Sequence, residues 1–169
     1  MTKQEKELFK SLCSFTVEFS PETAYNKLNE YLDSDLEKYP FDGEGDVYGV
    51  VVLKYIAEYV MRLYRGDVPY ERMDRRVFRL IWEHKKVMLE RILLIEQVLG
   101  FGNEFSEKYK PIVEDANTMR MLYAAHHMKR RDSVLPVISN KLLKLMDQEI
   151  ELLSSLTEIL PKCVIHMIV

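Results

Sequence analysis

The stretch from Asp67 to Gly100 has the most regular alternation of apolar and polar positions in the chain, and it predicts a long amphipathic helix. Its apolar residues recur at spacings of three, four and seven, which places them on one side of an α-helix and most charged residues on the other. At 1.5 Å per residue this helix would be about 45 Å long and would set the long dimension of the molecule. The apolar positions are Val77, Ile81, Met88, Ile92, Ile95 and Leu99.

Most of the remaining chain also has helical periodicity, interrupted by clear start and stop signals. Ser20 followed by Pro21 predicts a helix start, because serine accepts from free N–H groups and proline loses nothing in the first turn. Pro40 predicts an end near Tyr39. The other helices are expected over 2–15, 47–65, 111–131 and 134–160, with one turn over 103–110 and an end at Pro161.

These patterns predict an all-α fold, a single-domain bundle of about six helices covering residues 1–169. The stretch from Val47 to Arg65 has one narrow polar ridge, formed by Lys54, Glu58 and Arg62, and is otherwise aliphatic or tyrosine. A helix with so narrow a polar strip is expected at the centre. The antiparallel C-terminal helices would pack around this central apolar helix.

Composition agrees with a cytoplasmic protein. The chain has 169 residues, 47% hydrophobic and 30% charged, which is typical of one globular domain. Its two cysteines, Cys13 and Cys163, form neither a disulfide framework nor a metal-ligand spacing. The N-terminus lacks the apolar core of a signal peptide, and the most apolar run, 47–63, is interrupted by charges. We therefore expect no membrane contact.

Four polar residues occupy positions where the helical patterns call for apolar ones, and they predict a buried polar network: His84, Arg91, His126 and Glu149. If the last three helices run alternately up and down, His84 and His126 should share one layer and Arg91 should lie within about a turn of Glu149. A buried charge needs a partner, so Arg91 and Glu149 are expected to pair. The network would fix helix register, or the four residues would form an exposed seam where a partner docks. A third interpretation is a small polar pocket with a histidine base or ligand and an arginine that holds an anion.

No metal or cofactor is expected. The Glu-x-x-His pattern of ferritin-like bundles is absent, and His126 and His127 point about 100° apart on a helix. A zinc site needs three or four convergent ligands, which the sequence does not offer. Phosphate-binding glycine loops and the G-x-S-x-G and H-E-x-x-H motifs are also missing.

Basic residues suggest a nucleic-acid surface as an alternative function. The net charge is −3, yet the stretch from Arg65 to Lys86 is predominantly basic, whereas the stretch from Glu18 to Asp46 is acidic. Such an asymmetry can steer a charged partner or can be neutralised within the fold. Pairs at i,i+4 such as Arg79–Glu83 favour an ordinary solvated face. The candidate residues are Arg72, Arg75, Arg76, Arg79, Lys129, Arg130 and Arg131.

Two arginine–histidine pairs are the candidate catalytic residues: Arg79 with His84, and Arg120 with His126. Their spacing resembles that of HEPN ribonucleases, small helical bundles that use an arginine and a histidine four to six residues apart. The resemblance implies that the arginine binds phosphate and the histidine moves a proton. The residue after each arginine is apolar here, where that family often has a polar one.

Taken together, the sequence favours a non-catalytic interaction or regulatory protein that acts through a protein partner or a homodimer. Its last helix and the apolar tail from Lys162 to Val169 are the expected contact surface. A nucleic-acid-binding or HEPN-like RNA-cleaving protein is the alternative.

Overall fold

The computed structural model describes residues 20–33, 47–100 and 102–167, with side chains described as far as Leu160. Within these residues the regular structure is entirely helical, which confirms the all-α prediction. The helix expected over 2–15 lies outside the described residues. The α-helices are α2 (Pro21–Leu32), α3 (Val52–Arg65), α4 (Val77–Leu99), α5 (Glu104–Lys129) and α6 (Val134–Met167), and a 3₁₀ turn covers Tyr70–Arg72.

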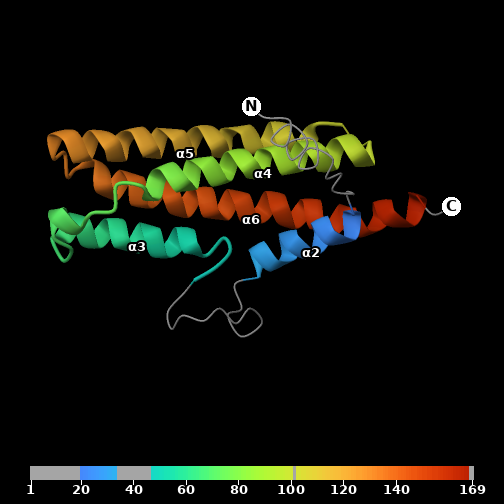
Figure 1. Cartoon of the computed structure of the whole chain (residues 1–169), viewed down its shortest axis with the longest axis horizontal. Coiled ribbons are helices and arrows are strands. Elements are labelled where there is room, and N and C mark those ends of the chain that lie inside the picture. The colour runs from blue at the N-terminus through green and yellow to red at the C-terminus, as the bar shows by residue number, and fades with distance from the viewer. Residues whose placement is uncertain (1–19, 34–46, 101, 168–169) are drawn as a thin grey trace, which may run out of the picture.

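The helices form four rows, of which one is divided between two short helices (Figure 1). The helices α4, α5 and α6 run alternately in opposite directions, and α4 packs on α5 and α5 on α6. The helices α2 and α3 follow one another end to end along α6. Among the described helices, close packing of this kind is absent between α4 and the α2–α3 row. We call this the open side of the bundle, in the sense that no described helix closes it.

The helix with the most neighbours is α6, which packs against α2, α3 and α5. The expectation that the stretch from Val47 to Arg65 lies at the centre is therefore corrected. Tyr55 and Tyr64 of α3 are 53% and 48% exposed, because a tyrosine can cover apolar surface with its ring while its hydroxyl stays in water. The seam residues Leu142, Leu145 and Leu156 of α6 are fully buried.

The start of α4 differs from the sequence prediction. The helix begins at Val77, and the preceding residues form the 3₁₀ turn and an extended segment. Asp74 holds this segment, because its carboxylate accepts from the N–H of Arg76 at 2.9 Å while its own N–H donates to the hydroxyl of Tyr59. A side chain that bonds to the nearby main chain competes with helix formation at that point.

Two prolines that were predicted to mark helix ends lie inside helices instead. Pro111 is within α5, which is continuous from Glu104, and Pro161 is within α6, which continues to Met167. Each proline removes one N–H···O=C bond, to the carbonyl four residues earlier, and packing of the rest of the helix outweighs that loss. The contacts predicted for the tail from Lys162 to Val169 lie outside the described side chains.

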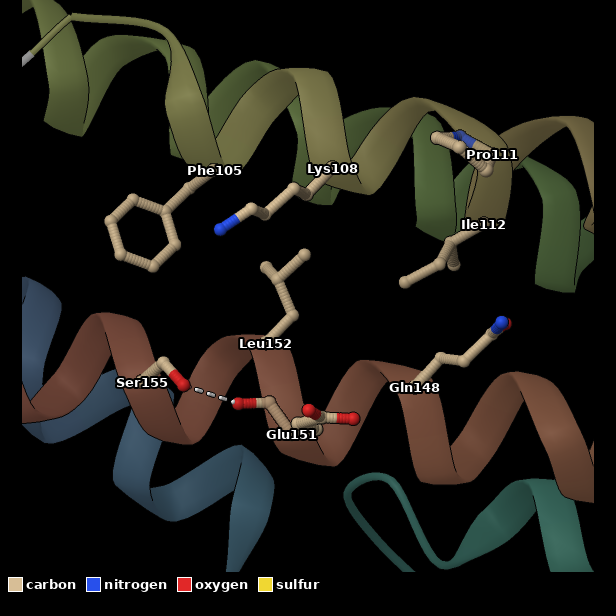
Figure 2. Close-up of a pocket in the computed structure, with 8 residues that line it drawn as sticks. All are labelled: Phe105, Lys108, Pro111, Ile112, Gln148, Glu151, Leu152 and Ser155. Carbon is tan, nitrogen blue, oxygen red and sulfur yellow. Dashed lines mark hydrogen bonds between the residues drawn. The ribbon is translucent and has the colours of Figure 1, made fainter.

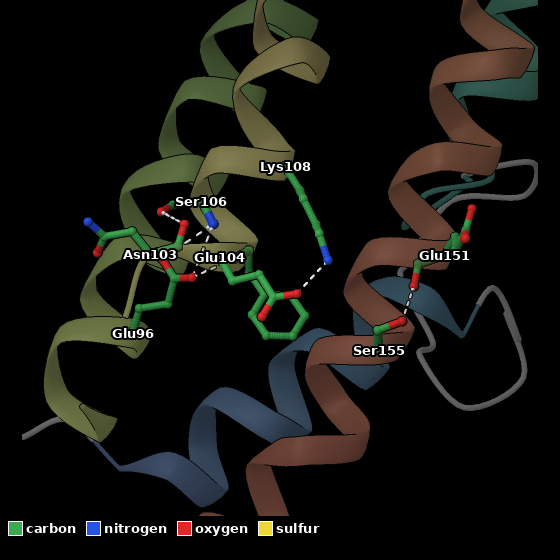
Figure 3. A network of polar contacts seen from close by, with 8 residues as sticks. Glu96, Asn103, Glu104, Ser106, Lys108, Glu151 and Ser155 are labelled. Carbon is green, nitrogen blue, oxygen red and sulfur yellow. Dashed lines mark hydrogen bonds and ion pairs between the residues drawn. The ribbon is translucent and has the colours of Figure 1, made fainter. Parts of the chain in front are cut away.

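The start of α5 is capped by a side chain from the preceding helix. Asn103, the N-cap residue, makes no side-chain cap bond. Instead the carboxylate of Glu96, fully buried at the end of α4, accepts from the N–H groups of Phe105 at 2.6 Å and Ser106 at 3.2 Å (Figure 3). A carboxylate at a helix N-terminus satisfies free N–H groups and interacts favourably with the helix dipole. Glu96 therefore fixes the turn between α4 and α5.

Replacing Glu96 by alanine is expected to lower the free energy of unfolding by about 1–2 kcal/mol, because buried N–H groups of α5 lose their acceptor. Chemical denaturation measures the loss. Glu104→Ala is the matched control, since its ion pair with Lys108 is exposed and should contribute at most about 0.5 kcal/mol. Equal effects of the two substitutions would show that Glu96 does not act as the cap.

At the junction between α2 and α3, two segments of the main chain approach each other closely. Gly49 lies against Tyr31, the penultimate residue of α2, and the carbonyl of Tyr31 accepts from the N–H of Val50 at 2.9 Å. A Cβ atom on Gly49 would lie 2.3 Å from that carbonyl oxygen, and the φ of Gly49 is +69°. This position therefore requires glycine, and it sets where α3 begins relative to the end of α2.

Candidate functional site: an open groove above a buried ion pair

A buried ion pair lies at the centre of the bundle. The ammonium of Lys85 on α4 is 2.6 Å from Glu149 Oε2 on α6, and the two side chains are 2% and 0% exposed. Burying two charges is costly unless they pair and their remaining hydrogen-bonding capacity is used. Sequence reasoning identified Glu149 as a buried charge but missed Lys85.

Two tyrosines complete this cluster. The hydroxyl of Tyr31 on α2 donates to Glu149 Oε2 at 3.0 Å and accepts from Lys85 at 2.8 Å. The hydroxyl of Tyr109 on α5 donates to Glu149 Oε1. The cluster thus takes one residue from each of the four rows, and both carboxylate oxygens are bonded. We call Tyr31, Lys85, Tyr109 and Glu149 the central cluster.

Burial and the Glu149 carboxylate shift the acid–base properties of the cluster in consistent directions. Burial, and then the charge of Glu149, raise the pKa values of Tyr31 and Tyr109 far above the ordinary range, so both phenols stay protonated and donate. Burial lowers the pKa of Lys85, and the carboxylate opposes that shift. A cluster whose donors and acceptors are matched in this way is suited to holding helices in register.

The predicted buried polar network is corrected by these contacts. Glu149 and His126 are buried, whereas His84 and Arg91 are exposed. Lys85, and not Arg91, is the cation that pairs with Glu149. His84 and His126 do not share a layer: the level of His84 is that of Tyr109, and His126 follows Tyr109 by 17 residues on α5, about 25 Å along the helix.

The signal for Lys85 was present in the sequence. The buried residues of α4 form an uninterrupted repeat of three and four residues, and Lys85 occupies one of its positions. His84, one residue earlier, is turned by about 100° toward the surface, where its ring lies 5.4 Å from the ring of Tyr31. The repeat is Phe78, Ile81, Lys85, Met88, Ile92 and Ile95.

An apolar groove follows the open side of the bundle, between α4 and the α2–α3 row. One part, of about 480 Å³, lies between α2 and α4, and another, of about 380 Å³, lies between the start of α3 and α4. Tyr31 and His84 line both parts, so the two are adjacent and the central cluster lies beneath them. We call the two parts the α2 half and the α3 half of the groove. Apolar lining residues include Leu28, Met88, Leu94 and Ile95 in the α2 half and Val52, Ile56, Leu80 and Ile81 in the α3 half.

The edge of α4 beside this groove carries exposed apolar side chains at regular intervals. Leu80, Val87, Leu94 and Val98 are 59%, 49%, 48% and 40% exposed. With His84 and Arg91 they repeat at alternating intervals of four and three residues, so they form one stripe along the helix. This stripe is separate from the buried repeat of the same helix, and no described helix covers it.

A second cavity, of about 360 Å³, lies between α5 and α6 (Figure 2). Side chains of both helices point into it, among them Phe105, Lys108 and Leu152. Two of the polar groups at its walls have partners: Lys108 pairs with Glu104 at 2.6 Å, and Ser155 donates to the main-chain oxygen of Glu151. This cavity offers less apolar surface than the groove.

The structure brings the two predicted basic groups to the same end of the bundle. The hydroxyl of Tyr70 is 2.7 Å from Nδ1 of His127, and the guanidinium of Arg130 lies 4.2 Å from the ring centroid of Tyr70. The hydroxyl of Tyr123 donates to the carbonyl of Asp74. The segment with Arg72, Arg75 and Arg76 is thus held beside the end of α5, where Lys129, Arg130 and Arg131 lie.

His126 is buried beside this basic end, 3% exposed. Its Nδ1 lies 3.4 Å from Asp132 Oδ1 but forms no hydrogen bond within the described part of the chain. The ring of Tyr70 packs edge-on against it at 6.1 Å.

Each arginine of the candidate catalytic pairs already has a local partner. Arg79 donates to Glu83 at 2.8 Å, and Arg120 donates to Asn117 while it lies 4.6 Å from the ring centroid of Trp82. His84 contacts Tyr31, and His126 is buried as described.

Among the described residues, no three histidine, cysteine, aspartate or glutamate side chains are arranged to hold a metal ion. None of the described helices combines the length and the apolar character that a membrane crossing requires. Comparison of the chain with protein-family models, with curated proteins and with solved structures finds no match.

Proposed function

We propose that this chain is a non-catalytic interaction protein of the cytoplasm, and that the groove binds a helix of a partner protein. The observation that carries the proposal is the open side of the bundle, where an apolar groove runs beside the exposed stripe of α4. Contiguous exposed apolar surface is uncommon on monomeric proteins and marks interaction sites.

The dimensions of the groove support a helical ligand. Its lining residues on α4 extend from Val77 to Ile95, about 27 Å along the helix axis, which corresponds to a partner helix of about 18 residues. An amphipathic helix anchors in such a groove through side chains at i, i+3, i+4 and i+7. The exposed stripe of α4 repeats at intervals of four and three residues, so its side chains can pack between anchors with the same spacing on the partner helix.

The central cluster supports a binding function more than a catalytic one. Its hydroxyl, ammonium and carboxylate groups bond to one another, and the two charged members are almost completely buried. A general acid or base must reach the proton that it moves. The cluster instead gives the groove a rigid floor, which lowers the entropic cost of binding.

A double substitution in the groove, Leu80→Glu with Leu94→Glu, tests the proposal. Both side chains are exposed, so the fold should remain intact, and two charges placed in an apolar contact should weaken partner binding by at least about 100-fold. Affinity capture from the native cell, with quantification of the retained proteins, measures the effect. Circular dichroism and thermal unfolding check that the variant is folded.

Met128→Glu is the matched control, because Met128 is 78% exposed on α5 and does not line the groove. Proteins retained equally by the wild type and by Met128→Glu, but lost with the double variant, are groove partners. If the double variant retains the same proteins as the wild type, the groove is not the contact surface.

A nucleic-acid-binding protein is the second candidate, favoured by the convergence of two basic segments at one end of the bundle. Lysine and arginine side chains on one surface bind phosphates and release counterions. The ring of Tyr70 is already covered by Arg130 and stacks on His127, so base stacking on this tyrosine would require both to move. Phosphate contacts are therefore the chemistry that this end offers.

For this second candidate, the double substitution Arg75→Glu with Arg131→Glu should weaken RNA binding by at least about tenfold. It should also reduce the slope of log Kd against the logarithm of salt concentration by about two. Fluorescence anisotropy with a labelled single-stranded RNA over a salt series measures both quantities. Arg91→Glu, which lies in the groove, should leave RNA binding nearly unchanged. No binding by the wild type at low salt would remove this candidate.

A further inference from the structure

We infer that the partner helix is acidic at the end that lies over the α2 half of the groove. The inference rests on the proposed function and adds the chemistry of the partner and the position of its charges. It follows from the distribution of charged side chains among the residues that line the two halves.

The α2 half is bordered by cations. Lys27 of α2 and Arg91 of α4 line it, together with His84, and no aspartate or glutamate is among its described lining residues. Arg91 has no ion pair within the described part of the chain. Lys27 pairs with Glu30 at 2.6 Å, but the two side chains are 68% and 36% exposed, so water screens this pair and Lys27 can bind a second carboxylate.

The α3 half has a different character. Its one charged lining residue is Lys85, whose ammonium is buried in the ion pair with Glu149. Its other lining residues are aliphatic side chains, tyrosines, Gly49 and His84. A helix that fits the whole groove therefore needs apolar anchors along its length and carboxylates near one end only.

His84, between the two halves, is also affected by these charges. Partial burial, the ammonium of Lys85 and the guanidinium of Arg91 lower its pKa, while Glu149 opposes the shift. His84 is thus neutral at physiological pH, so a partner carboxylate is drawn to Arg91 and Lys27 rather than to the middle of the groove.

A second copy of the chain fits this charge distribution poorly. Arg91 lies near the middle of the α4 stripe, which extends from Leu80 to Val98. If α4 packed antiparallel against its own copy, the two Arg91 side chains would meet close to the two-fold axis, where like charges repel. An acidic helix of a different protein removes that conflict and pairs with both cations.

Designed peptides test the inference directly. Two labelled helices of about 18 residues have the same leucine anchors at i, i+3, i+4 and i+7; one has glutamates in a terminal turn and the other has lysines there. At low salt the acidic helix should bind the full chain about fivefold to tenfold more tightly, and the difference should shrink at high salt.

Arg91→Glu should abolish or reverse the preference, whereas Arg131→Glu, an exposed substitution at the other end of the bundle, should preserve it. Leu94→Glu should weaken both peptides. If both peptides bind with equal affinity and Leu94→Glu weakens both, the groove function stands and the acidic partner is wrong. If neither peptide binds, or if Leu94→Glu has no effect on them, the proposed function fails as well. Sedimentation of the protein alone as a dimer that Leu94→Glu dissociates would assign the groove to a second copy and overturn the inference.

Discussion

Replacing Glu149 by leucine is expected to lower the free energy of unfolding by about 3–5 kcal/mol, the largest effect of any single substitution proposed for this chain. The substitution leaves the ammonium of Lys85 buried without its carboxylate, and it removes the acceptor of Tyr31 and Tyr109. Removing one member of a buried pair costs much more than the pair contributes in net terms, because the remaining charge stays desolvated. Urea denaturation of the variant and the wild type measures the difference.

The double variant Lys85→Met with Glu149→Leu provides the control. It removes both charges and replaces them with apolar side chains of similar size, so the part of the loss that comes from the unpaired ammonium should return. The hydroxyls of Tyr31 and Tyr109 still lack their acceptor in this variant, so the recovery should be partial. A double-mutant cycle with Lys85→Met alone then gives the coupling between the two residues. If Glu149→Leu has an effect below about 1 kcal/mol, or if the double variant is less stable than both single variants, the ion pair is not organised as described.

Replacing Gly49 by alanine is expected to lower the free energy of unfolding by about 2–4 kcal/mol. The methyl group would lie 2.3 Å from the carbonyl oxygen of Tyr31, and the left-handed backbone at φ +69° adds the cost of about 1 kcal/mol or more that a residue with a Cβ pays there. Relief of the clash requires the junction between α2 and α3 to open, which breaks the bond from the N–H of Val50 to Tyr31. Denaturation curves of the variant measure the loss.

Gly102→Ala separates backbone strain from the clash. Gly102 has a φ of +79°, but apart from its chain neighbours no atom of the described residues lies within 4 Å of the position that its Cβ would take. This control should therefore cost about 1–2 kcal/mol through strain alone. Equal losses for the two variants would indicate that the contact between Gly49 and Tyr31 contributes nothing.

Local patterns predicted the helices well, because periodicity, caps and breakers act over a few residues. The predicted cap at Ser20 is present, with its side chain accepting from the N–H of Thr23. The helix expected to end at residue 65 does so, and Gly66 follows it in the left-handed conformation. Pro111 was misinterpreted because a proline signal cannot be weighed against tertiary packing that the sequence does not reveal. The cap on α5 was missed for a related reason, since Glu96 reaches it from the other side of the turn.

The site was harder to predict, because it depends on how helices face one another. A polar residue at a core position can be recognised, as Glu149 was, but its partner is set by the relative levels of separate helices. Lys85 lies six residues before the predicted partner Arg91, about 9 Å along α4. Glu149 is at the level of Lys85, so Lys85 is the cation that is buried. The groove follows from the absence of close packing between α4 and the α2–α3 row, a feature of the assembled bundle that local periodicity does not encode.

The division of one row into two short helices has a consequence for motions of the folded protein. Leu28 is the one buried residue among the 12 of α2, and among the described helices α2 packs mainly on α6. Such a helix can detach locally at lower free energy than the long helices, in a partial unfolding that leaves the rest intact. Each such event would carry Tyr31 away and admit water to the Glu149 carboxylate. A ligand that contacts both α2 and α4 would make this local unfolding of α2 less frequent. Tighter binding would therefore slow amide hydrogen exchange in α2, including at residues that the ligand does not cover.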